Sequence, residues 1–416
     1  MSKISKHKGL IEYIDRNKVE KLISELVKIP SPWFEEKEIT KFVKKWLEKR
    51  NLIPWYHQVS ETKMTKFEGN NVIAEIGNDN GPTILLNAHM DTVKICDGWK
   101  RDPFGAHVEG NRLYGLGALD MKSGLAAAMI AVEQLKKIEN QLKGKVLFAA
   151  VVDEEGPYGL GTDALIRDGI TDKCDMAIVT EPAAAFAPKG IHNPCLFIGA
   201  RGRYLYDIRV KGKAAHGSMP YLGVNAVFDA SKIVLELQKM KLGSHPFLGE
   251  GSLCILMIEG GGETISVPDK CRILADRHVV IGETEETVKK DVEEAIKKLD
   301  IKSKVEIGFR NAPYPEVKGY GTYITSKDHK LVKELENSFE ELSGQKPVLS
   351  SFVSVGDFNY LGDKNRANLP TVIIGAEGDN VHAPEEYVDL ESATEITKVL
   401  MGGLINLLCA EKNNNL

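Results

Sequence analysis

The feature of this sequence that most constrains its fold is a set of short, continuous apolar runs. They include ILL within residues 82–87, VLFAAVV at residues 146–152 and MAIVT at residues 176–180. A run of this kind, without alternating polar residues, is typical of a strand that is buried on both faces of a parallel or mixed sheet. Two further strands are predicted at residues 71–76 and 371–375. Such a sheet needs helices on both faces, so the sequence predicts an α/β layered fold.

Helical patterns separate these runs. Apolar side chains recur at intervals of three and four before Pro30 and again over residues 35–50. An alanine-rich helix is predicted at residues 120–137, and two more helices are predicted at residues 329–343 and 391–408. The alternation of strands and helices indicates a mixed-sheet α/β domain.

The pattern changes near Gly199. Residues 203–211 alternate apolar and polar side chains, as a strand with one solvated face does. A helix, two strands, a helix and a strand are predicted to follow, at residues 225–241, 253–258, 271–280, 283–299 and 304–309. The order β-α-β-β-α-β predicts an α+β sandwich at residues 200–313, inserted into a larger domain formed by residues 1–199 and 314–416.

Length and composition restrict the class of protein. With 416 residues the chain is too long for one ordinary core, which favours two domains. The net charge of -5 argues against a nucleic-acid or membrane-surface partner. No signal peptide is apparent, and the longest apolar run falls far short of the roughly 18 residues that a membrane span needs. The six cysteines form no C-x-x-C pair, which is typical of reduced thiols. We therefore expect a cytoplasmic protein.

Residues with metal-binding or acid–base chemistry follow the predicted strands. They are His89 and Asp91 after residues 82–87, Glu154 and Glu155 after residues 146–152, Glu181 after residues 176–180, and Asp379 and His382 after residues 371–375. Asp120 opens the alanine-rich helix. Ligand sites in open α/β sheets form outside the carboxyl ends of the strands, so we expect these side chains at one edge of the sheet.

The chemical types in this set indicate a metal site. Two histidines with three or more carboxylates and no cysteine suit Zn²⁺, Co²⁺ or Mn²⁺ rather than a structural thiolate site. Three or four ligands satisfy one catalytic ion, so the larger supply predicts two ions that share a carboxylate, typically ~3.5–4 Å apart. Each piece also has a structural explanation, such as a helix N-cap for Asp120 or a solvated turn for residues 153–155. Their coincidence at successive strand ends favours the metal site.

The same residues lie in motifs that resemble a known enzyme family. This family of dizinc N-deacylases and carboxypeptidases includes acetylornithine deacetylase, succinyl-diaminopimelate desuccinylase, aminoacylase and glutamate carboxypeptidase. The matching stretches, in family order, are AHMDTV at 88–93, GLGALDMKSG at 115–124, DEEG at 153–156, KAAHGSMP at 213–220, GVNA at 223–226 and VHAPEE at 381–386. Leu116 departs from the pattern, because the family commonly has Arg between these two glycines. That position is not a ligand, so the departure concerns only the local support of the helix start.

The resemblance implies a ligand set for two divalent ions. Asp120 would bridge them, His89 and Glu181 would complete one site, and Glu155 and His382 would complete the other. Zn²⁺ is the expected metal, and Co²⁺ and Mn²⁺ are the alternatives, because nitrogen and carboxylate ligands separate these ions weakly.

It also implies roles for residues that do not bind metal. Asp91 would accept a hydrogen bond from the distal nitrogen of His89 and fix its tautomer. Glu154 would be the general base that takes a proton from the attacking water. His216 would stabilise the tetrahedral oxyanion. Asn225 and Arg277 resemble positions that hold a substrate carboxylate, although a cross-strand ion pair is an equally good interpretation of Arg277.

The implied function is hydrolysis of the amide bond of an N-acyl amino acid, a small substrate that carries a carboxylate. A dipeptidase or carboxypeptidase with the same chemistry is the alternative, because specificity depends on pocket shape. A non-catalytic binding protein on this fold would be favoured by missing ligands, and all ligand positions are filled. The resemblance further implies that residues 200–313 form a lid through which a homodimer assembles, and that His216 enters the active site of the other subunit.

Overall fold

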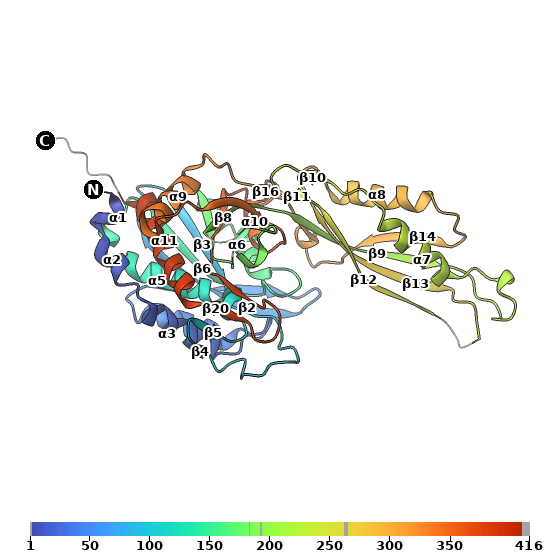
Figure 1. Ribbon diagram of the computed structural model, residues 1–416, viewed down its shortest axis with the longest axis horizontal. Coiled ribbons are helices and arrows are strands. Elements are labelled where there is room, and N and C mark those ends of the chain that lie inside the picture. The colour runs from blue at the N-terminus through green and yellow to red at the C-terminus, as the bar shows by residue number, and fades with distance from the viewer. Residues whose placement is uncertain (1, 183, 192–193, 262–264, 410–416) are drawn as a thin grey trace. The chain divides into compact units, whose positions relative to one another are not determined.

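The computed structural model describes residues 2–182, 184–191, 194–261 and 265–409, which form two compact units (Figure 1). Unit 1 comprises Met1–Ala200 and Tyr323–Leu416, and unit 2 comprises Arg201–Thr322. The first division lies one residue from the predicted boundary. The second prediction, after residue 313, is wrong by nine residues. The segment beyond it includes β15 (Gly319–Tyr320), which pairs with β9 (Gly202–Lys211) and so belongs to unit 2.

Unit 1 is built on a mixed sheet with the strand order β1-β2-β6-β3-β7-β18-β8-β16, and β17 pairs with β8. The strands are β1 (Trp55–Glu61), β2 (Phe67–Gly77), β3 (Thr83–His89), β6 (Lys145–Val151), β7 (Met176–Val179), β8 (Cys195–Ala200), β16 (Tyr323–Ile324), β17 (Val348–Phe352) and β18 (Thr371–Ile373). Strands β6, β3, β7 and β18 are neighbours and run parallel. Their carboxyl ends therefore lie at one edge of the sheet.

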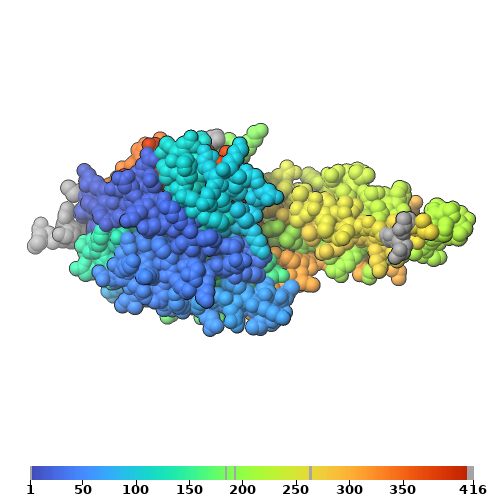
Figure 2. All heavy atoms as spheres, turned by 90° about the horizontal axis from the view of Figure 1, so that it is seen from below, coloured from blue at the N-terminus to red at the C-terminus, as the bar shows by residue number. Residues whose placement is uncertain are grey.

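Helices cover both faces of this sheet. The helices of unit 1 are α1 (Lys3–Lys6), α2 (Lys8–Glu12), α3 (Arg16–Val27), α4 (Lys37–Glu48), α5 (Ser123–Lys136), α6 (Leu160–Arg167), α9 (Lys330–Ser343), α10 (Phe358–Gly362) and α11 (Leu390–Leu408). Helix α5 packs on β2, β3 and β6, and α11 lies against α5, α9 and α3 (Figure 1). The chain that forms α3 and α4 is exposed on the face that Figure 2 presents, in dark blue. The predicted α/β fold is confirmed.

The strands of this sheet are apolar throughout because successive side chains point to opposite faces and both faces are buried. Leu85 and Leu147 join a buried cluster with Leu165 of α6 and Phe358 of α10. Ile84, the neighbour of Leu85, is equally buried and points to the opposite face, where α5 packs. Burial on both faces requires a continuous apolar run, which is the pattern seen in the sequence.

A second, smaller sheet in unit 1 has the order β19-β20-β5-β4. Its strands are β4 (His107–Glu109), β5 (Arg112–Tyr114), β19 (Gly378–Asp379) and β20 (Tyr387–Asp389). The loop between β19 and β20 carries His382, whose φ is 58°. This sheet therefore supplies the part of the site that follows β18 in the chain.

Unit 2 contains the predicted β-α-β-β-α-β order. The elements are β9, α7 (Ala226–Leu237), β12 (Ser252–Gly261), β13 (Lys270–Val279), α8 (Glu285–Lys297) and β14 (Lys304–Phe309), with short strands β10 (Ser244–His245) and β11 (Gly249–Glu250). The main sheet is antiparallel with the order β12-β13-β9-β14, and the apolar sides of α7 and α8 share its buried cluster. Over the residues that the structure describes, we find no helix with the length and apolar character of a bilayer span.

Candidate metal centre

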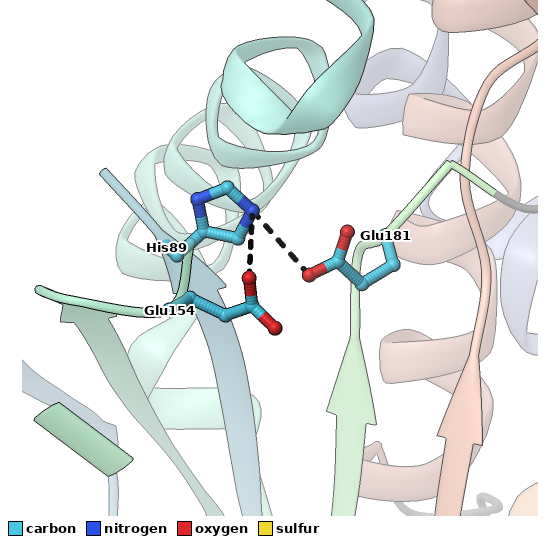
Figure 3. Close-up of side chains that lie close together, drawn as sticks. All are labelled: His89, Glu154 and Glu181. Atoms are coloured by element: carbon cyan, nitrogen blue, oxygen red, sulfur yellow. Dashed lines mark ion pairs between the residues drawn. The ribbon is translucent and has the colours of Figure 1, made fainter. Parts of the chain in front are cut away.

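The parallel strands of unit 1 bring the predicted metal-binding side chains together. His89 is the last residue of β3, Glu154 and Glu155 follow β6, and Glu181 follows β7. Figure 3 shows His89, Glu154 and Glu181 pointing toward one another from three neighbouring strand ends. One ligand atom from each of these three residues can be chosen so that all three lie within 4.8 Å of one another. The expected gathering at the carboxyl edge of the sheet is therefore present.

Asp120 lies between the two histidines. Its Oδ1 is 3.2 Å from His89 Nε2, and its Oδ2 is 3.4 Å from His382 Nε2. Glu181 Oε1 lies 3.5 Å from the same nitrogen of His89, and both carboxylate oxygens of Glu155 lie 2.9 Å from His382 Nε2. The Asp120 carboxylate thus has one oxygen toward the His89–Glu181 pair and the other toward the His382–Glu155 pair. This is the arrangement that a bridging ligand between two ions requires.

Glu154 occupies a different position from these ligands. Its Oε1 accepts a hydrogen bond from the Asp357 backbone N–H at 3.1 Å, and its Oε2 is 4.0 Å from His89 Nε2. Burial and the neighbouring carboxylates Asp357 and Glu155 raise its pKa well above the usual range, outweighing the attraction of His89. A carboxylate with a raised pKa is a stronger base than an ordinary glutamate, which suits the predicted role of general base.

The centre contains more carboxyl groups than imidazoles, so carboxylates repel one another there. Burial, together with repulsion from Asp120, raises the pKa of Glu155 to about 7. Burial also raises the pKa of Glu181 well above its usual range. The pKa of His382 rises to about 11, because hydrogen bonds to Asp120 and Glu155 outweigh its burial. Bound cations would relieve this repulsion, so two imidazoles and a cluster of buried carboxylates fit divalent metal ions.

The predicted hydrogen bond from His89 to the Asp91 carboxylate is wrong, although the two side chains are neighbours. His89 Nδ1 lies 3.0 Å from the backbone carbonyl oxygen of Asp91, whereas the carboxylate Oδ1 is 3.6 Å away. The carboxylate instead accepts hydrogen bonds from the backbone N–H groups of Glu154 and Glu155. Asp91 therefore orients His89 through its backbone and the Glu154–Glu155 turn through its side chain.

The start of the alanine-rich helix also differs from the prediction. Asp120 has φ -110° and ψ 100°, and α5 begins only at Ser123, so Asp120 is neither helical nor an N-cap. Its backbone N–H donates to Glu386 Oε1, which also accepts from the Leu119 N–H, while Oε2 accepts from Gly117. Glu386 is 1% exposed. Sequence reasoning gave Glu386 no role, although it ends the matching stretch VHAPEE, which was the available signal.

Three predicted site residues lie in unit 2. His216 is exposed, and its Nδ1 accepts a hydrogen bond from the Ser218 N–H at 3.2 Å. Asn225 is the N-cap of α7, with Oδ1 accepting from the Phe228 N–H. Arg277 is 1% exposed and pairs with Glu283 and Asp291. Arg277 thus forms ion pairs, but its partners are Glu283 in the turn after β13 and Asp291 on α8, not residues across the sheet. Its contact with a substrate carboxylate stays a prediction.

Comparison with known protein families identifies the family of this chain. Residues 85–405, most of the chain, match the peptidase family M20/M25/M40. The chain belongs to this family. The matched range contains all five predicted metal ligands and Glu154, and the M20 assignment confirms the resemblance seen in the motifs. The chain is accordingly a metal-dependent hydrolase that acts on amide bonds.

The Escherichia coli protein YgeY is 28% identical to this chain over 382 residues, which cover 88% of each chain. The succinyl-diaminopimelate desuccinylase of Hydrogenovibrio crunogenus is 25% identical over 349 residues, covering 82% of this chain and 88% of that enzyme. These matches span both units of the structure.

Solved structures confirm the M20 fold. Aminopeptidase PepT from Bacillus cereus superposes with a TM-score of 0.74 at 22% identity, covering 94% of this chain and 99% of that chain. The YXEP protein of Bacillus subtilis, described as a dinuclear metal-binding peptidase of the M20 family, superposes with a TM-score of 0.68 at 19% identity, covering 94% and 98%. At these identities the likeness establishes the fold alone.

Proposed function

We propose that this M20 enzyme hydrolyses the amide bond of an N-acyl amino acid and holds two divalent ions while it does so. The observation that carries the proposal is the position of Asp120, with one carboxylate oxygen toward His89 and the other toward His382. His89, Asp120 and Glu181 would hold one ion. Asp120, Glu155 and His382 would hold the other. The Bacillus subtilis relative described as dinuclear supports the number of ions.

When bound, the ions supply positive charge that makes a water molecule acidic and polarises the scissile carbonyl. Glu154 would take a proton from the attacking water, because its Oε2 faces the centre while the Asp357 N–H holds Oε1. The same carboxyl group can deliver the proton to the leaving amine. His216 would stabilise the oxyanion and Asn225 would contact the substrate carboxylate; both remain proposals for unit 2.

The acyl-amino-acid class is supported by the motifs and by the desuccinylase relative. Peptidase activity on a dipeptide, or removal of a terminal residue from a peptide, is the alternative, because the aminopeptidase PepT has the same fold. A binding protein without activity is disfavoured, since every proposed ligand position is filled. Zn²⁺ is the proposed metal. Cys96, Cys174, Cys254, Cys271 and Cys409 carry free thiols, which supports the proposed cytoplasmic location.

A substrate screen tests this proposal. Enzyme loaded with Zn²⁺, Co²⁺ or Mn²⁺ is incubated with N-acetyl amino acids, N-succinyl amino acids and dipeptides, and the released amine is quantified. We expect the fastest release from an N-acyl amino acid and loss of activity after chelation. Faster hydrolysis of dipeptides would establish the alternative substrate class. Elemental analysis that finds only trace metal after reconstitution would exclude the dinuclear proposal.

A further inference from the structure

The turn that carries Glu154 and Glu155 is held by two carboxylates. Asp91 accepts hydrogen bonds from the backbone N–H of Glu154 at 3.2 Å and of Glu155 at 2.8 Å. The preceding N–H, that of Asp153, donates to Glu36 Oε1 at 3.0 Å. Three successive backbone donors are therefore satisfied by side chains that are distant in sequence. Glu36 lies outside every motif that matches the family.

This turn has a backbone conformation that needs support. Asp153 has a φ of 59°, in the left-handed region that residues other than glycine rarely adopt. Asp153 is fully buried, and Oδ2 of its side chain accepts a hydrogen bond from the Leu160 N–H at 3.1 Å. Rotation of the turn at Asp153 would redirect both Glu154 and Glu155. A buried acceptor for the Asp153 N–H therefore fixes the direction of these two side chains.

Glu36 is itself held rigidly. Its side chain is 3% exposed, and Oε1 also accepts a hydrogen bond from the Phe34 N–H at 3.0 Å. Its backbone carbonyl oxygen accepts hydrogen bonds from the backbone N–H and the hydroxyl of Thr40, in the first turn of α4. Burial, together with repulsion from Asp91, raises the pKa of Glu36 to about 8. Both the neutral and the ionised carboxyl retain an acceptor oxygen for these two N–H groups.

We propose that Glu36 is a positioning residue for the hydrolysis proposed above, on which this assignment rests. Its carboxyl group fixes the turn at Asp153 and thereby the alignment of Glu154 and Glu155 with His89. Glu36 touches neither the substrate nor the proposed ions. It acts on the reaction through the backbone of the turn.

Three variants separate this role from general stability. Glu36→Ala removes the acceptor, Glu36→Gln keeps a carbonyl acceptor of the same reach, and Glu35→Ala removes the exposed neighbouring carboxylate. We expect Glu36→Ala to lower kcat by about 10- to 100-fold with KM changed less than about twofold, because small misplacements of catalytic groups are that costly. The kcat of Glu36→Gln should stay within about threefold of the wild-type value, and the kcat of Glu35→Ala should equal the wild-type value. Equal losses of kcat in Glu36→Ala and Glu36→Gln would overturn the proposal.

Chemical rescue is a second measurement. Glu36 lines a surface cavity of about 380 Å³ together with Phe34, Phe67 and Val152, among others. Removal of its side chain enlarges this cavity, which gives formate access to the Asp153 N–H. We expect formate to restore kcat of Glu36→Ala in a concentration-dependent way and to leave wild type and Glu35→Ala unchanged. Absence of rescue at saturating formate would count against the role of this acceptor.

Amide hydrogen exchange gives a readout that needs neither substrate nor activity. In Glu36→Ala, peptides covering residues 153–160 should exchange faster than in wild type, Glu36→Gln or Glu35→Ala. Peptides from β7 serve as the internal reference within unit 1. Faster exchange in all peptides of unit 1, or unchanged exchange at residues 153–160, would overturn the positioning role. If the turn responds while wild type hydrolyses none of the substrates, the proposed function fails and the structural role of Glu36 stands.

Discussion

The carboxylates around His89 divide by the groups that they face. Asp120, Glu155 and Glu181 face imidazole nitrogens, as metal ligands would. Asp91 and Glu36 face backbone N–H groups of the turn after β6. A carboxylate that accepts backbone hydrogen bonds sets the direction of the chain, and the neighbouring carboxylates then bind or react. The two kinds of residue should therefore respond differently to mutation.

The adjacent residues Glu154 and Glu155 provide the clearest contrast. Changing Glu154 to Gln removes the base and leaves the ligands in place, so we expect turnover to fall by at least ~10²-fold with full metal content. Changing Glu155 to Ala removes a ligand, so we expect lower metal occupancy. Turnover assays and elemental analysis of both proteins measure this. The opposite pattern would exchange the roles assigned to the two residues.

The pKa of Glu36 predicts a pH dependence of stability in protein stripped of metal. Its folded pKa is about 8, against 4.5 for an ordinary Glu, so between these values the folded state holds a proton that the unfolded state has released. The stabilisation is fully present below pH 4.5 and is lost as pH rises to 8. Glu36→Gln carries no such proton. We expect the free energy of unfolding of wild type to fall relative to Glu36→Gln by up to about 1.4 kcal/mol per pH unit in this window.

Urea denaturation of both proteins at several pH values measures the difference. Glu35→Ala is the control, because Glu35 is exposed and no comparable change relative to wild type is expected. Stability curves for wild type and Glu36→Gln that run parallel between pH 5 and pH 8 would contradict the raised pKa.

At the residue scale, the sequence indicated where side chains gather and left open which groups they contact. The strand-end pattern correctly predicted that His89, Glu154 and Glu181 lie together. It could not show that the Asp91 side chain turns back to the backbone, because that contact depends on the conformation of the turn. Glu36 was missed for the same reason, since its partner is a backbone N–H 117 residues away.

At the element scale, close packing of α5 against the end of β7 positions two of the proposed ligands. Gly124, in the first turn of α5, lies so near β7 that a Cβ added there would be 1.8 Å from the Thr180 carbonyl oxygen. Thr180 directly precedes Glu181, and Asp120 lies just before α5. The glycine therefore sets the spacing between the segments that carry these two carboxylates.

We predict that Gly124→Ala destabilises the protein by about 2 kcal/mol or more, because the clash is with backbone that cannot rotate away. Metal content should also fall, because the clash displaces the segment that ends in Glu181. Gly9→Ala is the matched control in a helix, since nothing lies within 4 Å of an added Cβ there. That change should be neutral or stabilising by about 0.5–1 kcal/mol. Equal urea midpoints for Gly124→Ala and wild type would show that α5 has room for a Cβ beside the Thr180 carbonyl oxygen.

The elements themselves were largely predictable because periodicity reports burial. The apolar runs at β3, β6 and β7 are buried on both faces, and β14 was predicted at its observed bounds. Strand β8, with the sequence CLFIGA, is fully buried and was missed. It is short, contains Gly199 and ends at Ala200, where the chain passes from unit 1 to unit 2 and the sequence pattern changes.

At the scale of the whole molecule, unit 2 presents an open sheet edge. Strand β12 pairs with β13, and among the described residues no strand pairs with its other side. Leu256 and Ile258 on this strand are 50% and 49% exposed. Its sequence, SLCILMIEGG, contains neither lysine nor proline, the residues that commonly protect such edges. The periodicity of apolar residues predicts the strand itself. It does not predict what pairs with the open edge, because backbone hydrogen bonds between strands leave no pattern in the sequence of one strand.

This edge supports the proposal that the protein is a homodimer through unit 2. A two-fold contact between the two copies of β12 would pair the exposed backbone groups and cover the apolar side chains. We propose, as in the sequence-based prediction, that His216 of one subunit completes the active site of the other. Size-exclusion chromatography with light scattering tests the dimer, and a protein that stays monomeric at working concentration would refute it without affecting the metal chemistry.

Complementation tests whether His216 acts between subunits. His216→Ala and Glu154→Ala proteins, each inactive alone, are mixed under conditions that allow subunit exchange. If His216 is donated in trans, a mixed dimer has one site with both groups intact, because Glu154 comes from one chain and His216 from the other. Random exchange makes half of the dimers mixed, so roughly a quarter of wild-type activity should return. If His216 acts within its own chain, every site lacks one group. In that case no activity returns, even when differently tagged subunits are shown to have exchanged.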